Sequence, residues 1–156
     1  MEHYKLIIGL GNPDAEYEST YHNVGHLIID FLDHKKLSPK PYSLKTTVYM
    51  NESGKFVKEA LKNHKAKPDS LLIVHDDSDI ALGKYKLSFA RNAGGHRGVQ
   101  NIIDQLKTNA FWRLRIGIRP LREKVRAKAD ELVLKKISPA NRKKLEGVFK
   151  EIAKNF

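Results

Sequence analysis

The segment Leu6-Ile7-Ile8-Gly9-Leu10-Gly11-Asn12-Pro13 decides the fold class of this chain. Its apolar residues predict a buried strand over residues 4–10, and the glycines, Asn12 and Pro13 predict a turn directly after it. In α/β sheets, the turn after a strand is where ligand-binding and catalytic side chains usually lie. Asn12 and the nearby His22 bring a carboxamide and an imidazole to this place, so we expect a functional site there.

Strand and helix patterns alternate along the rest of the chain. Residues 35–43 read as a loop, and Leu71 to Val74 is apolar throughout, which is typical of a central strand buried on both faces. Arg113 and Arg115 alternate with apolar residues, which predicts a strand with one solvated face. Two further strands are expected at 46–50 and 83–89. Four helices are expected: one over residues 24–34, one that begins at a Ser53 cap, one that follows the turn at 94–98, and one that begins at Ser138-Pro139.

This order predicts an α/β fold, a three-layer sandwich with a mixed, largely parallel sheet flanked by helices. The 156 residues suit a single domain over 1–156 with a sizeable core. No apolar run is long enough to span a bilayer and no signal-peptide pattern is present, so we expect no membrane partner and a cytoplasmic location. The chain has no cysteine, which excludes disulfides, thiol catalysis and thiolate metal sites.

The charge balance points to a polyanionic partner. Lysine and arginine number 29 against 18 acidic residues, a net charge of +11, and nucleic acid is the leading candidate. A basic surface without such a partner, or a compositional bias, is the alternative. The candidates for phosphate contacts are Arg91, Arg97, Arg119, Arg122, Lys124, Arg126 and Lys128, although the run from Arg119 onward equally fits a solvated connector.

Polar side chains follow several predicted strands, and they form a possible catalytic group. These are Asn12 with His22, then residues 50–54, residues 75–79 directly after the buried run, and the turn at 94–98. Because the carboxyl ends of parallel strands meet at one edge of a sheet, these segments could converge. Asp76 could orient His22 and stabilise its protonated form, while Asn12 and Asn51 could hold a carbonyl group. Without a convincing serine or cysteine nucleophile, the chemistry would be water activated by histidine, with no metal.

Structural interpretations of the same residues remain open. A single histidine is more often structural than catalytic. The acidic residues at 76–79 could form a solvated turn or a hard-cation site, and Asn51 could be a turn residue. The glycines at 94–98 give only a weak phosphate-binding signal, because the lysine and hydroxyl residue of a P-loop are missing.

At these positions the sequence resembles bacterial-type peptidyl-tRNA hydrolases. The resemblance rests on motifs that occur in the family's order along most of the chain: Gly9-Leu10-Gly11-Asn12-Pro13, Tyr17, Thr20, His22-Asn23-Val24-Gly25, Tyr49-Met50-Asn51-Glu52-Ser53-Gly54, Val74-His75-Asp76, Gly94-Gly95-His96 and Arg113-Leu114-Arg115-Ile116-Gly117-Ile118.

The resemblance implies hydrolysis of the ester between a peptide and the terminal ribose of tRNA, by a monomer that needs neither metal nor cofactor. It makes His22 the base that activates water, Asp76 the residue that holds His22, and Asn51 a catalytic and substrate-binding residue. Asn12 would help to select peptidyl-tRNA over unblocked aminoacyl-tRNA. Further substrate or tRNA contacts are implied for Tyr17, Tyr49, Gly95, His96 and Arg97.

The chain departs from the family pattern at several points. Asp14 stands where the family usually has glycine, Tyr21 replaces an arginine, and Arg97 replaces a substrate-binding asparagine. The loop at 35–43 is short for the family. Arg97 and the short loop motivate one rival hypothesis, a catalytically weak or inactive RNA-binding relative that serves RNA processing. A third reading is an α/β enzyme that acts on a different small ester or amide.

Overall fold

A five-stranded mixed sheet forms the centre of the protein. The computed structural model describes residues 3–34, 41–121 and 129–155. The strands are β1 (Leu6–Gly9), β2 (Tyr42–Lys45), β3 (Leu71–Ala81), β4 (Tyr85–Phe89) and β5 (Trp112–Arg119), in the spatial order β2-β1-β3-β5-β4. The neighbouring pairs are parallel except β4 with β5, which is antiparallel. The predicted mixed, largely parallel sheet is therefore confirmed.

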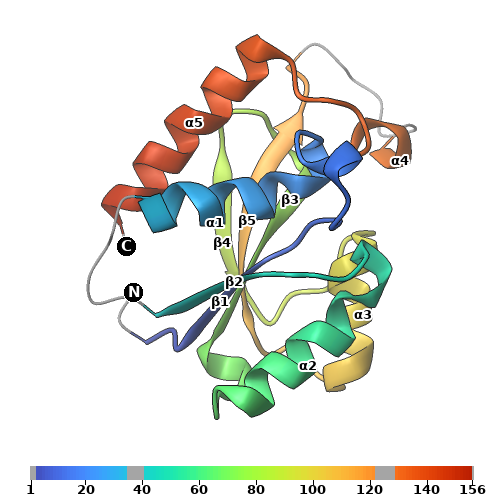
Figure 1. The fold of residues 1–156 in the computed structure, drawn as a ribbon, viewed down its shortest axis with the longest axis vertical. Coiled ribbons are helices and arrows are strands. Elements are labelled where there is room, and N and C mark those ends of the chain that lie inside the picture. The colour runs from blue at the N-terminus through green and yellow to red at the C-terminus, as the bar shows by residue number, and fades with distance from the viewer. Residues whose placement is uncertain (1–2, 35–40, 122–128, 156) are drawn as a thin grey trace.

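Helices cover both faces of this sheet (Figure 1). Helices α1 (Val24–His34) and α5 (Pro139–Lys154) lie on one face, and α2 (Ser53–Asn63) and α3 (Arg97–Leu106) lie on the other. The short helix α4 (Ala129–Leu132) precedes α5, and single 3₁₀ turns form at Ala15–Tyr17, Tyr21–Asn23, Met50–Glu52 and Pro68–Ser70. The three-layer α/β sandwich predicted from the alternating pattern is confirmed. None of the described helices is long and apolar enough to cross a bilayer.

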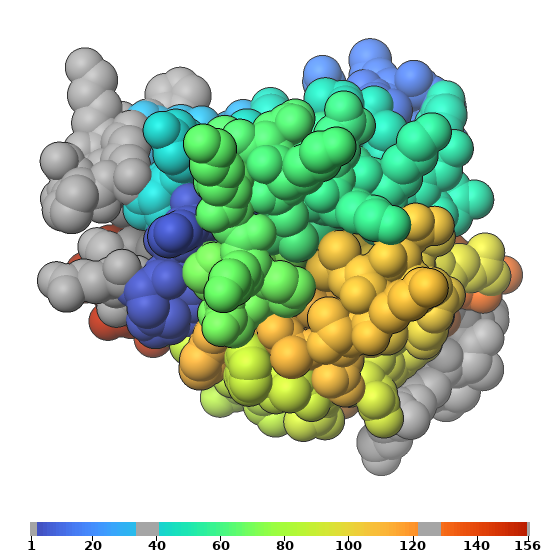
Figure 2. Space-filling view, turned by 90° about the horizontal axis from the view of Figure 1, so that it is seen from below, coloured from blue at the N-terminus to red at the C-terminus, as the bar shows by residue number. Residues whose placement is uncertain are grey.

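The strands supply two hydrophobic cores because their side chains alternate between the two faces. Leu6 and Ile8 of β1 pack with α2 and α3, whereas Ile7 packs with α1 and α5. The same alternation continues along β3, whose Leu72 and Val74 join Ile7 in the core under α1 and α5. Helices α2 and α3 lie directly against each other on the face seen in Figure 2, and Gly54 N donates to Asn101 Oδ1 between them at 2.7 Å.

Two strand predictions were wrong in their position. The strand expected at 46–50 lies instead at Tyr42–Lys45, and its first two residues belong to the predicted loop at 35–43. Thr46 N still donates to Gly9 O at 3.1 Å, but the chain then leaves the sheet and its polar groups bind the turn after β1. Residues 75–79 do not follow a strand, because β3 continues through Ala81 by pairing with β5.

Two side-chain predictions were also wrong. Arg113 and Arg115 were expected on a solvated face, yet they are only 3% and 6% exposed. Strand β5 lies between β3 and β4, where Arg115 Nε donates to Asp77 Oδ2 at 2.8 Å and Arg113 Nη2 donates to the Asn92 carbonyl. Ser53 begins α2 without capping it, since its hydroxyl donates to Met50 O. Ser138 does cap α5 as predicted, by accepting from Asn141 N.

Candidate active site

A pocket of about 740 Å³ opens at the carboxyl edge of the sheet. Strand β1 ends at Gly9, which pairs with Val74, so β3 continues beyond its neighbour from His75 onward. This end of β3 and the segments around it form the wall. The lining residues are Asn12, His22, Tyr49, Met50, Asn51, Asp76, Asp77, Ser78, Asp79, Ala93, Gly94, Gly95, His96, Arg97, Ala129, Asp130, Val133 and Leu134.

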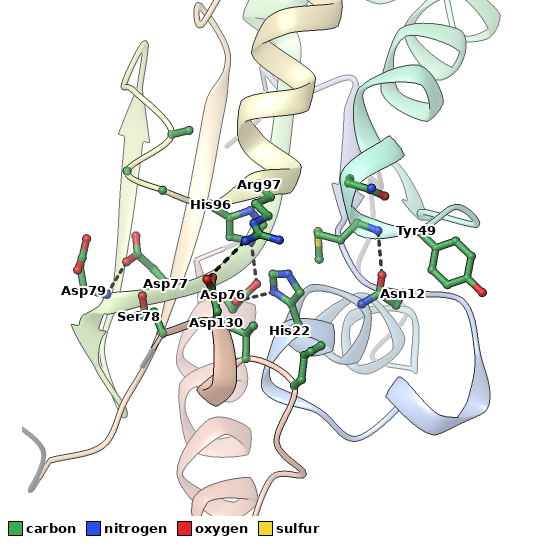
Figure 3. A pocket seen from close by; sticks show the side chains of 18 residues that line it. Asn12, His22, Tyr49, Asp76, Asp77, Ser78, Asp79, His96, Arg97 and Asp130 are labelled. Atoms are coloured by element: carbon green, nitrogen blue, oxygen red, sulfur yellow. Dashed lines mark hydrogen bonds and ion pairs between the residues drawn. The ribbon is translucent and has the colours of Figure 1, made fainter. Parts of the chain in front are cut away.

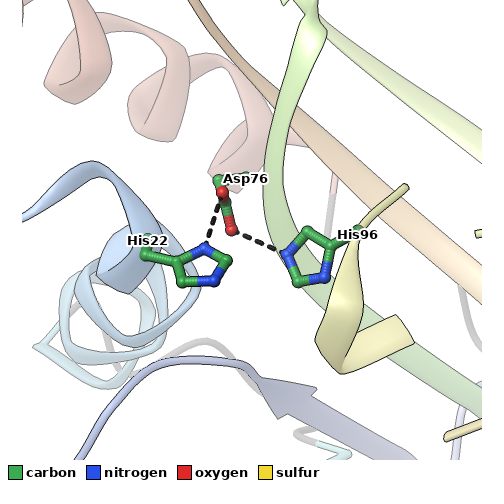
Figure 4. Close-up of side chains that lie close together, drawn as sticks. All are labelled: His22, Asp76 and His96. Carbon is green, nitrogen blue, oxygen red and sulfur yellow. Dashed lines mark hydrogen bonds and ion pairs between the residues drawn. The ribbon is translucent and has the colours of Figure 1, made fainter. Parts of the chain in front are cut away.

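Two histidines share the carboxylate of Asp76 inside the pocket (Figure 4). His22 Nδ1 lies 2.9 Å from Asp76 Oδ2, and His96 Nε2 lies 2.9 Å from Asp76 Oδ1. His22 comes from the turn before α1, Asp76 from β3, and His96 from the residue that caps α3. The predicted approach of His22 to Asp76 is confirmed, whereas the approach of His96 to the same carboxylate was not predicted.

The hydrogen bonds fix the tautomers of both rings. His96 Nδ1 accepts from Val99 N at 3.2 Å, so its proton lies on Nε2 and is donated to Asp76. His22 donates through Nδ1 to the other carboxylate oxygen, which leaves its Nε2 as an acceptor. No described residue hydrogen-bonds to His22 Nε2, and the ring lies on the pocket wall. The imidazole is therefore oriented to receive a proton from a molecule in the pocket.

The two histidines keep Asp76 ionised although it is almost completely buried. Burial alone would raise the pKa of the Asp76 carboxyl, but the facing rings of His22 and His96 hold that pKa far below its ordinary value. Burial lowers the pKa of His22, and Asp76 more than offsets this, so the His22 pKa lies above 6.5. Asp76 thus stabilises the protonated imidazole that a general base must become.

Asn12 is held from several sides beside His22 (Figure 3). Its Oδ1 accepts from Met50 N at 2.8 Å, its backbone N donates to Asn23 Oδ1, and its carbonyl accepts from Asn23 Nδ2. Asn12 Nδ2 has no partner among the described residues and turns toward the side of the pocket that holds His22. The site therefore presents a fixed amide donor next to the histidine.

Arg97 and Asp130 form an ion pair across the pocket (Figure 3). Arg97 Nη2 lies 3.4 Å from Asp130 Oδ2, and the two side chains are 76% and 85% exposed. Such an exposed pair contributes little to stability, so Arg97 can exchange Asp130 for another anion. Both charges act on His22, whose pKa Arg97 lowers and Asp130 raises.

The other predicted site residues differ in where they lie. Asn51 and Tyr49 line the pocket from the segment before α2, and Tyr49 donates to Asp14 Oδ2 at 2.5 Å. Gly95 lies in the turn before α3, where its φ of +88° is one that favours glycine. Tyr17 lies in a 3₁₀ turn and does not line the pocket.

Comparison with known proteins identifies the family. The family described as peptidyl-tRNA hydrolase matches residues 6–43 and 36–156. A peptidyl-tRNA hydrolase of Aquifex aeolicus is 37% identical over 165 residues, covering 94% of this chain and 85% of its own. One from Mycoplasmopsis pulmonis is 35% identical and covers 96% and 86%. The crystal structure of peptidyl-tRNA hydrolase from Acinetobacter baumannii has a TM-score of 0.85 at 29% identity, covering 99% and 87%.

The chain belongs to the peptidyl-tRNA hydrolase family. The resemblance inferred from the motifs is thereby confirmed, and the rival RNA-processing interpretation is not favoured. Members of the peptidyl-tRNA hydrolase family are enzymes, and the hydrogen-bonded histidine on the pocket wall supplies a base of the kind that ester hydrolysis needs.

The departures from the peptidyl-tRNA hydrolase pattern have local structural partners. Asp14 accepts the hydrogen bond from Tyr49, which joins the turn after β1 to the segment before α2. Tyr21 is buried, and its hydroxyl accepts from Asn141 Nδ2 of α5 at 2.8 Å. Arg97 contacts Asp130. Most of the shortened loop at 35–43 lies outside the described residues. The same holds for four of the candidate phosphate-binding residues, Arg122, Lys124, Arg126 and Lys128.

Within the described part of the chain, one group of side chains has ligand atoms close enough for a metal ion. These are His22, Asp76 and His96, whose ligand atoms lie within 4.8 Å of one another. Three of their four ring nitrogens are already hydrogen-bonded, because both rings direct an N–H at Asp76 and His96 Nδ1 accepts from Val99 N. A metal would have to replace these hydrogen bonds, so the arrangement fits general-base chemistry better.

Sequence reasoning missed part of the peptidyl-tRNA hydrolase pocket. Asp130, Val133 and Leu134 reach it from α4 and the residues after it, which carry no polar motif after a strand. Asp77 was considered as part of a strand-end polar segment, a solvated acidic turn or a hard-cation site, whereas it binds the buried Arg115. Asp77 and Arg115 have opposite charges, but only the pairing of β3 with β5 brings them together.

Proposed function

We propose that this chain hydrolyses the ester bond of peptidyl-tRNA, with His22 as the base that activates water. The observation that carries the proposal is the His22 ring, whose Nδ1 is bound to the ionised Asp76 while Nε2 is available to the pocket. Family membership supplies the substrate class. The products are the free peptide and a tRNA that can be charged again.

The reaction follows from the positions of these groups. His22 Nε2 takes a proton from water while the water oxygen attacks the ester carbonyl carbon. Asp76 stabilises the resulting imidazolium across the 2.9 Å contact and keeps the ring in the productive orientation. When the tetrahedral intermediate collapses, the bond to the ribose oxygen breaks. The imidazolium returns its proton to that oxygen, so the base is regenerated.

Other pocket residues bind and orient the substrate in this proposal. Asn12 Nδ2 and the Asn51 side chain donate to the reacting carbonyl or to the peptide beside it. Arg97 leaves Asp130 and binds a phosphate of the tRNA end, and Gly95 and Tyr49 flank the same path. His96 acts mainly through Asp76, because both ring nitrogens are used within the protein. Tyr17 contacts tRNA outside the pocket.

Release of peptide from an N-acetylated aminoacyl-tRNA tests the function. We expect His22→Ala to lower kcat by about 100-fold to 10,000-fold, which is the usual contribution of a general base. His64→Ala is the matched control, since His64 lies at the end of α2 and does not line the pocket. If His22→Ala cleaves as fast as the parent, the proposed mechanism is wrong. A well-folded parent that binds tRNA without cleavage would contradict the proposed function itself.

The charge of the chain supports a tRNA substrate. The excess of +11 matches a polyanionic ligand, and the exposed Arg97 brings positive charge to the pocket. We further propose that a single domain acts as a monomer in the cytoplasm, without metal or cofactor. Unchanged hydrolysis after exhaustive treatment with a chelator is the result expected for such an enzyme.

A further inference from the structure

The hydroxyl of Thr46 forms a compact hydrogen-bond cluster behind Asn12. Gly11 N lies 3.2 Å from Thr46 Oγ1, and Thr46 Oγ1 lies 3.1 Å from Gly11 O. His26 Nε2, from the first turn of α1, lies 3.0 Å from the same hydroxyl. Thr46 is almost completely buried and follows the last residue of β2. Three segments that are separate in sequence therefore meet at one oxygen atom.

Hydrogen-bond chemistry assigns a direction to each of these contacts. A hydroxyl has one proton to donate, and the Gly11 carbonyl can only accept, so Thr46 donates to Gly11 O. The Thr46 oxygen then accepts from Gly11 N and from His26 Nε2, and His26 must carry its proton on Nε2. Burial and the nearby Lys45 lower the pKa of His26 to about 4, although Asp30 opposes this, so His26 is neutral near pH 7.

The cluster replaces a missing strand partner. Strand β1 ends at Gly9 and β2 ends at Lys45, so the backbone N–H and C=O of Gly11 lie beyond the paired part of the sheet. Thr46 satisfies both of these buried groups. His26 packs so closely over Gly11 that a β-carbon there would lie 2.7 Å from its ring. Position and hydrogen bonding of the Gly11 backbone are thus set by two side chains.

Gly11 directly precedes the residue whose amide faces His22. Asn12 is held by Asn23 and Met50 on one side, and the Thr46 cluster holds the preceding residue on the other. We infer that Thr46 and His26 are positioning residues that aim Asn12 Nδ2 at the reacting group of the substrate. This inference rests on the proposed function, and it assigns a role in turnover and selectivity to two residues outside the pocket lining.

A double-mutant cycle tests this inference. Thr46→Val keeps the shape of the side chain and removes the hydroxyl, so we expect kcat/KM for N-acetylated aminoacyl-tRNA to fall about tenfold. Thr46→Ser should return to within about twofold of the parent, because it restores the hydroxyl. In an Asn12→Ala background, Thr46→Val should cause almost no further loss. A full additional tenfold loss in that background would overturn the inference.

A stability control separates positioning from general weakening of the fold. Val57→Ala creates a cavity under α2, and Val57 takes no part in the hydrogen bonds around Thr46. The assay temperature is chosen so that Val57→Ala and Thr46→Val have the same free energy of unfolding. Val57→Ala should retain the parent kcat/KM at that matched condition. An equal loss of activity in both variants would show that Thr46 acts only through stability, and the inference would fail.

A measurement without tRNA distinguishes this inference from the proposed function. In NMR spectra, Thr46→Val and His26→Phe should shift the Gly11 amide and Asn12 side-chain amide signals and accelerate exchange of the Gly11 amide. His26→Gln, which can keep a donor near Nε2, should restore them in part. Unchanged signals in both variants would overturn the inference. A parent that gives the expected spectra but cleaves no peptidyl-tRNA would instead contradict the proposed function.

Discussion

At the scale of single residues, Asp76 connects the electrostatics of the site to its catalysis. Its carboxylate is buried, yet it accepts a hydrogen bond from each of two imidazoles. Both ring nitrogens of His96 are used within the protein, so His22 is the ring that can take up a proton from a molecule in the pocket. Burial of a lone carboxylate would be unfavourable, and the paired rings offset that cost.

We expect Asp76→Asn to change the pH profile as well as the rate. The active form of His22 is neutral, so kcat/KM should fall as the pH drops through the His22 pKa, which Asp76 holds above 6.5. Without that charge, burial and Arg97 dominate over Asp130 and lower the His22 pKa, so the acidic limb should move to lower pH. Turnover should fall on the order of 100-fold because the imidazolium loses its partner.

Kinetic measurements between pH 5 and 9 on Asp76→Asn check this sign. The change in KM should be small, since Asp76 binds His22 and not the substrate. Asn12→Ala is the matched control, because it should lower kcat/KM without moving the acidic limb. An acidic limb at the parent position in Asp76→Asn would contradict the role assigned to Asp76.

Individual contacts were predictable from sequence only where the parallel direction of the strands places a residue at the carboxyl edge of the sheet. The parallel sheet predicted that Asp76 and His22 would approach each other at one edge, and they do. The burial of Arg115 was not predictable from an alternating pattern, because that pattern does not reveal that Asp77 of the neighbouring strand β3 binds its guanidinium. The use of Thr46 by Gly11 depends on β2 ending at Lys45, whereas the sequence pattern predicted a strand over 46–50.

At the scale of secondary structure, the packing of α2 on α3 supports the pocket. Asn51 lies in the turn just before α2, and Arg97 begins α3 directly after His96, so pocket residues lie at the N-terminal end of each helix. Gly54 and Asn101 bring the two helices together, and a β-carbon on Gly54 would lie 2.3 Å from the Asn101 carbonyl oxygen. The atom in the way belongs to the backbone of α3, so it cannot move aside as the end of a flexible side chain could.

The same substitution should have opposite effects at two helical glycines. Gly54→Ala should lower the free energy of unfolding by about 1–3 kcal/mol, because it forces α2 away from α3. It should also lower kcat/KM by displacing Asn51 or Arg97. Gly147→Ala, in the exposed part of α5 with no atom within 4 Å of its β-carbon, should raise stability by about 0.5–1 kcal/mol. Urea unfolding of both variants tests the pair, and equal changes would contradict it.

Helices were more predictable than strands in this chain. The spacing of Leu27, Ile28, Phe31 and Leu32 carries the pattern of α1 within the element itself. The β-branched segment at 46–50 has strand propensity, but pairing with β1 is already taken by Tyr42–Lys45. The position of a strand depends on the strand with which it pairs. A prediction from residue propensity alone therefore placed β2 at the wrong residues and ended β3 too early.

At the scale of the whole molecule, the excess positive charge bears on how an acidic pocket can bind a negatively charged substrate. The peptide ester must enter a site lined by Asp76, Asp77, Asp79 and Asp130, while the attached tRNA is strongly negative. An exposed guanidinium at the pocket can bind phosphate and also shield the tRNA from these carboxylates. Arg97 occupies that position and already contacts one of them, Asp130. Under the proposed function, substrate binding exchanges this weak internal ion pair for a phosphate contact.

The salt dependence of tRNA binding should reveal this contact. A plot of the logarithm of the association constant against the logarithm of the salt concentration should have a steep negative slope, because phosphate contacts release counterions. Arg97→Asn should weaken binding and reduce the size of that slope by about 0.7, the value for one contact to a single strand. Lys58→Asn on α2, outside the pocket lining, removes the same charge and should leave the slope unchanged. If Arg97→Asn weakens binding with no change in slope, Arg97 contacts an uncharged part of the substrate, and the exchange of Asp130 for phosphate does not occur.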